Sequence, residues 1–111
     1  MMAWFRKNVE EEYQAYKNRI LQETPEIIWD KCSEIYFYSC LYEYCMYNEA
    51  ISYWVAKALG ECTNIIAGCW ELYLKNEELS IISWADIDEL IDSYLQHIPN
   101  GGKDYGYYAV C

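Results

Sequence analysis

The chain has 111 residues, a length that fits one domain. Its 54% hydrophobic and 23% charged residues allow a packed core and exclude wholesale disorder. Eighteen acidic residues against eight basic ones give a net charge of −10, which argues against binding to nucleic acid or to an anionic membrane surface.

The sequence has no continuous apolar stretch long enough for a signal peptide or for a membrane span of about 18 residues. We therefore expect a cytoplasmic protein without a membrane partner. The six cysteines form no C-x-x-C pair, and in a reducing compartment we expect most of them to be buried free thiols. Cys111 is the thiol that we expect to be most exposed.

Two prolines and five glycines leave room for long helices. The first is predicted from Ala3 to Gln22, because apolar residues recur there in steps of three and four along one helical face. That face consists of Phe5, Val9, Tyr13, Tyr16 and Ile20.

A second helix is predicted to begin at Thr24-Pro25-Glu26, which combines a capping side chain, a proline suited to the first position and an acidic first turn. It continues to Tyr47. Nearly every position from Tyr36 to Tyr44 is apolar or aromatic, so a strand competes with the helix there. We favour a mostly buried helix because no other segment offers a strand as a partner.

Asn48 is predicted to cap a third helix that stops at Gly60, and Thr63 to cap a fourth. Gly68 lies inside the fourth helix, where it either weakens the helix or permits the close approach of a neighbour. A loop is expected from Asn76 to Ser80.

The last helix is predicted to begin at Ser83-x-x-Asp86, a capping box with Asp in place of Glu, and to end before Pro99. Its core-facing residues are expected to be Trp84, Ile87, Leu90, Ile91, Tyr94, Leu95 and Ile98. The fold class is therefore all-α: a single-domain bundle of four or five helices over residues 1–111, with 99–111 as a tail that either packs back on the bundle or stays mobile.

Motifs for catalysis and metal binding are missing from the sequence. His97 is the only histidine; it lacks the Cys–His spacing typical of zinc sites, and it is the one conventional base that a cysteine nucleophile could use. The sequence also contains no phosphate-binding glycine motif. We expect no enzyme activity, no metal and no cofactor.

The distribution of charge is more informative. No Lys or Arg occurs from Asn76 to Gly102, and on a helix carboxylates three or four residues apart lie roughly 5–6 Å from each other. Such a row resembles a phosphate backbone and could occupy a basic groove; the alternative is the ordinary solvated face of an amphipathic helix. The predicted partner-binding carboxylates are Glu77, Glu78, Asp86, Asp88, Glu89 and Asp92.

A cluster of six aromatic residues lies between Tyr36 and Tyr47. One side of a helix cannot bury all six, so some are expected on the surface, where tyrosines commonly anchor interfaces. Tyr38, Tyr42 and Tyr44 are the predicted contact residues, and burial in the core is the alternative.

Several short patterns together suggest a family. They are Glu12-x-x-x-Tyr16, Thr24-Pro25-Glu26-Ile27-Ile28, Glu34-Ile35-Tyr36, Ala56-Lys57-Ala58-Leu59, Trp70-Glu71-Leu72-Tyr73-Leu74 and Asp86-x-x-Glu89. Their order resembles a small helical domain of unknown function carried by phages, plasmids and conjugative elements of Gram-positive bacteria. This resemblance implies a mobile-element origin and a bacterial host cell. By analogy of class it suggests an inhibitor of host defence, such as an anti-CRISPR protein that mimics DNA.

Three functions are therefore considered. The first is inhibition of a bacterial nucleic-acid-targeting enzyme, with a basic nucleic-acid-binding protein such as a CRISPR effector nuclease as partner and no direct contact with nucleic acid. The second is a structural or regulatory interaction module that forms a homo-oligomer. The third, which ranks last, is a small metal-dependent enzyme.

Overall fold

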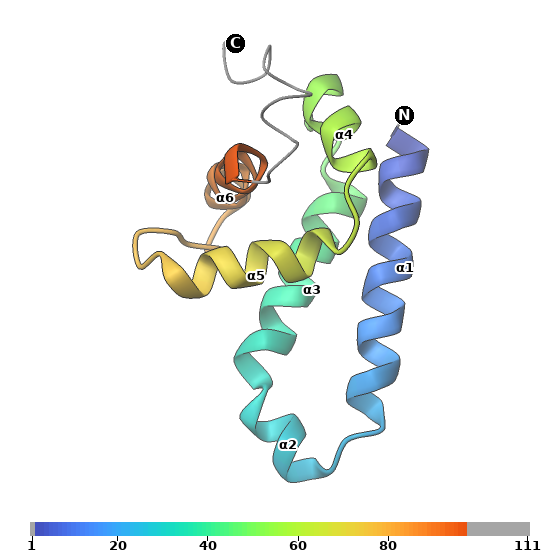
Figure 1. Ribbon diagram of the computed structural model, residues 1–111, viewed down its shortest axis with the longest axis vertical. Coiled ribbons are helices and arrows are strands. Elements are labelled where there is room, and N and C mark those ends of the chain that lie inside the picture. The colour runs from blue at the N-terminus through green and yellow to red at the C-terminus, as the bar shows by residue number, and fades with distance from the viewer. Residues whose placement is uncertain (1, 98–111) are drawn as a thin grey trace.

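The computed structural model describes residues 2–97 and shows six α-helices and no strand within them (Figure 1). These helices are α1 (Met2–Leu21), α2 (Pro25–Asp30), α3 (Cys32–Tyr47), α4 (Tyr53–Gly60), α5 (Ile65–Lys75) and α6 (Trp84–His97). The all-helical prediction is confirmed, and the aromatic segment from Tyr36 to Tyr44 is helix. The predicted tail at 99–111 lies outside the described residues.

Residues 2–97 form six helices because the predicted second helix divides at Lys31. The backbone of Lys31 (φ −97°, ψ 13°) ends α2 and starts α3. Thr24 caps α2 as expected, since its Oγ1 accepts a hydrogen bond from the Ile27 N–H at 3.4 Å. No glycine or proline marks the division. α2 buries none of its residues, so core packing does not hold it in line with α3.

α1 and α3 lie side by side and run in opposite directions, with α2 at the turn between them (Figure 1). Two stacked tyrosine pairs join them: the Tyr16 and Tyr38 ring centroids are 3.7 Å apart, and those of Tyr13 and Tyr42 are 4.2 Å apart. The shared core also receives side chains from α4, α5 and α6. Its fully buried large residues include Phe5, Val9, Phe37, Leu41, Tyr44, Leu59, Ile65, Ile66, Ile87, Leu90 and Ile91.

The predicted start of the third helix at Asn48 is wrong. Asn48 instead ends α3, and its Oδ1 accepts a hydrogen bond from the Ala50 N–H at 2.9 Å. α4 starts after Ser52, whose Oγ accepts from the Val55 N–H at 3.2 Å. The side chain of Asn48 thus forms an Asx turn with Ala50 and does not cap a helix.

α4 docks against α1 through Gly60. The Gly60 carbonyl accepts hydrogen bonds from Trp4 Nε1 at 2.7 Å and from Asn8 Nδ2 at 3.1 Å. A Cβ at this position would lie 3.1 Å from Trp4 Cδ1. α4 ends at Gly60 as predicted, and the glycine also permits the close approach of the two helices.

The predicted cap of α5 at Thr63 is also wrong. Asn64 precedes the helix in a left-handed conformation (φ 54°), and its side chain caps nothing. The carboxylate of Glu12 on α1 serves instead, accepting hydrogen bonds from Ile66 N and Ala67 N at 2.9 Å each. Burial raises the pKa of Glu12 above its ordinary value of 4.5 and outweighs the lowering effect of these bonds.

Gly68 permits close packing between α5 and α6, one of the two roles considered for it. A Cβ at Gly68 would lie 2.5 Å from Tyr94 Cε1. Within residues 2–97, none of the helices is long and apolar enough to cross a bilayer.

Candidate functional site

The predicted acidic residues fall into two groups with different environments. Asp86 belongs to the expected capping box: its Oδ2 accepts from the Ser83 N–H at 3.0 Å, and its own N–H donates to Ser83 Oγ at 3.3 Å. The same oxygen accepts from the Ser80 hydroxyl at 3.1 Å. Asp86 is therefore occupied in starting α6, which weakens its assignment as a partner-binding residue.

Asp88 is exposed but also has an internal partner. Its Oδ1 accepts a hydrogen bond from the Tyr44 hydroxyl on α3. Tyr44 is 2% exposed, and burial followed by this bond raises the pKa of its phenol. The contact ties α6 to α3, and the Trp84 ring lies nearly perpendicular to the ring of the same tyrosine, with 6.0 Å between ring centroids.

The remaining carboxylates lie on the surface. Glu77 and Glu78 are exposed in the connection between α5 and α6, and Glu89 and Asp92 are exposed on α6. Neither this connection nor α6 contains a Lys or Arg, and neither does α3, which packs beside α6. We call Glu77, Glu78, Glu89 and Asp92, together with Asp88, the acidic surface.

The predicted contact tyrosines are mostly part of the interior. Tyr38 is 4% exposed and Tyr44 2%, so neither can form a contact surface, and their assignment is corrected. Tyr42 is half-buried against Tyr13 and has its pKa raised to about 12, chiefly by its hydrogen bond to Glu10. Helical spacing explains this outcome, because Tyr38, Tyr42 and the intervening Leu41 share the face of α3 that packs on α1.

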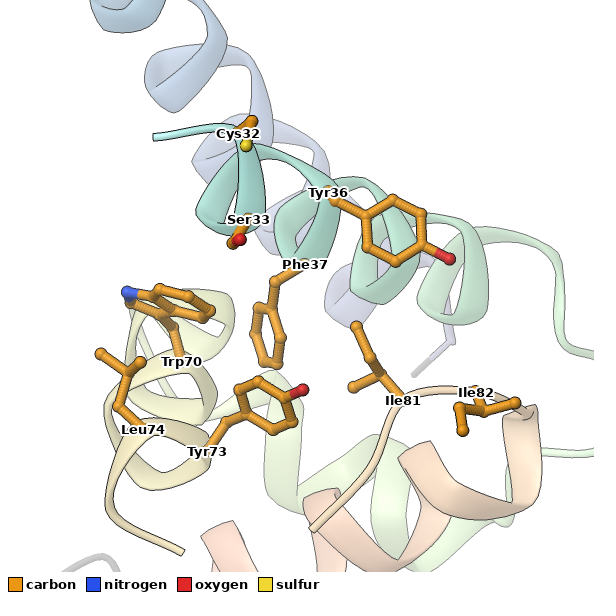
Figure 2. Close-up of a pocket in the computed structure, with 9 residues that line it drawn as sticks. All are labelled: Cys32, Ser33, Tyr36, Phe37, Trp70, Tyr73, Leu74, Ile81 and Ile82. Atoms are coloured by element: carbon orange, nitrogen blue, oxygen red, sulfur yellow. The ribbon is translucent and has the colours of Figure 1, made fainter. Parts of the chain in front are cut away.

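Other aromatic and aliphatic side chains form the exposed part of α3 and its neighbours. Tyr36 is 62% exposed, Leu74 62% and Ile82 92%. These residues border a groove of about 600 Å³ between α3, α5 and the α5–α6 connection. Figure 2 shows Phe37 at its centre, facing Trp70 and Tyr73 of α5. The full lining is Cys32, Ser33, Tyr36, Phe37, Trp70, Tyr73, Leu74, Ile81 and Ile82, which we call the aromatic groove.

A second hollow of about 540 Å³ lies on the other side of Tyr36, between α2 and α3. Cys32 and Tyr36 line both hollows, so the apolar surface continues across α3. Trp29 of α2, which is 79% exposed, borders this second hollow. No sequence pattern indicates this surface, because only the relative placement of α3 and α5 leaves Trp70 and Leu74 at its edge.

Within the described part of the chain, no group of three or more His, Cys, Asp or Glu residues is arranged to hold a metal. His97 is exposed, and its Nδ1 lies 2.6 Å from the Ser93 carbonyl, to which it donates in the matching tautomer. Burial raises the pKa of the Cys45 and Cys69 thiols, which makes them poor nucleophiles.

Comparison with protein-family models, curated proteins and solved structures finds no match to this chain. The resemblance to a mobile-element domain therefore stays a prediction.

Proposed function

We propose that this chain is a non-enzymatic inhibitor that binds the basic nucleic-acid-binding surface of a bacterial defence enzyme, in the manner of an anti-CRISPR protein that mimics DNA. The observation that carries the proposal is the acidic surface. It places exposed carboxylates on α6 and on the connection before it, without a neighbouring Lys or Arg on these elements or on α3.

Electrostatics explains why such a surface would favour a basic partner. The ion pair between Lys7 and Glu11, at 4.0 Å, lies on α1 and not on the acidic surface. Neither α6 nor the connection before it contains a Lys or Arg that would offset the field of this surface, and the nearby Lys75 lies just before the connection, at the end of α5. Lys and Arg side chains that normally contact phosphates would be attracted to the acidic surface, and this attraction speeds association and selects against acidic partners.

Rigidity also supports the proposal. α6 is fixed by its capping box and by the hydrogen bond between Tyr44 and Asp88. Its side chains Leu90 and Ile91 are buried in the core, and each is at most 1% exposed. A fixed row of carboxylates binds at a lower entropic cost than a mobile acidic tail.

The test uses the full chain and a panel of purified CRISPR effector nucleases. Binding of each effector to the immobilised chain is measured without DNA at ionic strengths from about 0.05 to 0.5 M, a range over which exposed charges become strongly screened. Displacement of fluorescent target DNA is measured in parallel. We expect at least one effector to bind with an affinity that falls as salt rises, and to release its DNA. Failure of all effectors on both measurements would contradict the anti-CRISPR form of the proposal.

The aromatic groove favours a second candidate function, a structural or regulatory module that forms a homo-oligomer. Exposed apolar surfaces of this kind commonly mark interfaces. Sedimentation of the chain across the same salt range distinguishes the two, because an apolar homo-oligomer would persist at high salt.

A further inference from the structure

We propose that the aromatic groove binds an amphipathic helix of the partner protein, with apolar side chains entering the groove and flanking Lys or Arg side chains facing nearby carboxylates. The inference deepens the proposed function and rests on it, since it supplies an anchor for the partner that the acidic surface attracts.

The lining of the aromatic groove suits apolar side chains. Phe37 forms its floor, and its ring centroid lies 5.1 Å from those of both Trp70 and Tyr73. Ile81 and Ile82 close the opposite side (Figure 2). Few polar groups converge on this space, whereas sites for polar small molecules place several polar groups in fixed positions. Apolar side chains spaced along one face of a helix match such a groove.

The charges beside the aromatic groove favour a basic helix. Glu77 and Glu78 are exposed in the connection that leads to Ile81 and Ile82. On α3, the exposed Glu43 follows Tyr36 by seven residues and so lies on the same face, two turns further along.

Lys31 immediately precedes α3, and the one Lys or Arg within the two helices that form the aromatic groove is Lys75 at the end of α5. It follows Tyr73 by two residues and points to the other side of the helix.

The same charges disfavour two other occupants. A second copy of this chain also carries a charge of −10, so its own carboxylates would approach those of Glu77 and Glu78. An anionic lipid surface would be repelled in the same way.

The experiment measures peptide binding to the full chain by isothermal titration calorimetry. The probe is a synthetic capped helix with leucines at i, i+3, i+4 and i+7 and lysines at its other positions. One comparison peptide replaces the lysines by glutamates, and another has the same Leu/Lys composition in scrambled order. We expect the Leu/Lys helix to bind at least tenfold more tightly than either comparison peptide. Equal binding of the scrambled peptide or of the Leu/Glu peptide would overturn the inference.

Variants locate the binding site. Leu74→Ser with Ile82→Ser removes two exposed side chains at the rim of the aromatic groove without changing charge, so folding should be intact. We expect at least a tenfold loss of affinity for the Leu/Lys helix. Leu21→Ser removes an apolar side chain of similar exposure, 67%, from α1, and should leave affinity unchanged. Unchanged affinity in the double variant would overturn the inference. The inference would also be overturned if the wild type forms a dimer and the two serine substitutions dissociate it, because the aromatic groove would then bind a second copy of the chain.

Failure of this inference can be told apart from failure of the proposed function. If the Leu74/Ile82 variant keeps both peptide and effector binding while salt still weakens the effector complex, the aromatic groove is not the anchor and the proposed function stands. If the peptide binds in the aromatic groove but no effector binds the chain, the proposed function fails and only the peptide-binding property remains.

Discussion

Replacing Glu12 by alanine removes the acceptor shared by the Ile66 and Ala67 N–H groups at the start of α5. The adjacent cap position, Asn64, makes no side-chain cap, so nothing on α5 replaces the carboxylate. Loss of a helix cap costs about 1 kcal/mol, and an N–H left unpaired in a buried position costs roughly 1–3 kcal/mol. Because two half-buried N–H groups are affected and some desolvation of the carboxylate is relieved, we expect about 2 kcal/mol less stability and a melting temperature lower by about 5–10 °C.

The assay is urea unfolding followed by circular dichroism, with Glu11→Ala as the matched control. Glu11 is exposed and pairs with Lys7 at 4.0 Å on the surface of α1, so its loss should cost less than about 0.5 kcal/mol. Equal stability of the Glu12→Ala and Glu11→Ala variants would refute the conclusion that Glu12 caps α5.

Glu12→Gln adds a test by pH. A carboxyl whose pKa is raised on folding contributes stability that is present below its unfolded pKa and is lost as pH rises through its folded pKa. The pKa of Glu12 is raised from 4.5. We therefore expect the stability of the wild type relative to Glu12→Gln to increase as pH falls from 7 to about 4. A relative stability that decreases over this range would show that the hydrogen bonds, and not burial, dominate.

Three further predictions concern packing and thiol chemistry. Gly68→Ala should destabilise by roughly 1–3 kcal/mol, against the usual helix preference for alanine, because the new Cβ would overlap the Tyr94 ring; a stabilised variant in urea unfolding would contradict this. Tyr44→Phe should cost about 1 kcal/mol through the lost bond to Asp88, and an unchanged unfolding midpoint would exclude that bond as a tie between α3 and α6. Reduction should leave the melting temperature unchanged, and peptide mapping after brief alkylation should find Cys32 modified before the buried thiols; a large loss of stability on reduction would instead indicate a disulfide.

The sequence predicted local features well where one segment contained the whole signal. The face of α1 was correct at Phe5, Val9, Tyr16 and Ile20, all of which are buried. The capping box beginning at Ser83 was also correct, because both partners lie three residues apart in the same turn.

Predictions failed where partners are far apart in the chain. The cap of α5 comes from Glu12, more than fifty residues upstream, and no local pattern could indicate it. The same limit applies to the tyrosines of α3, because the position of α1 decides that Tyr38 is buried while Tyr36 is exposed. The aromatic groove likewise exists only once α3, α5 and the following connection are placed together.

The structure shows which of the predicted carboxylates are suited to a mutational test. Asp88 has a partner in Tyr44, so its reversal would disturb folding as well as binding. Glu77 and Glu78 are exposed, and their carboxylates do not cap a helix. Glu23 and Glu61 offer a control with the same change of charge, because both are exposed and lie outside the helices.

The central claim is that the acidic surface inhibits a nucleic-acid-targeting defence enzyme. The most direct measurement is plasmid survival in bacteria that carry a CRISPR effector inhibited by the wild-type chain. Cells express the wild type, Glu77→Lys with Glu78→Lys, or Glu23→Lys with Glu61→Lys at matched levels. We predict that plasmid survival with the Glu77/Glu78 variant is at least tenfold lower than with the wild type, whereas survival with the Glu23/Glu61 variant equals that with the wild type. Equal protection by both variants would contradict the account.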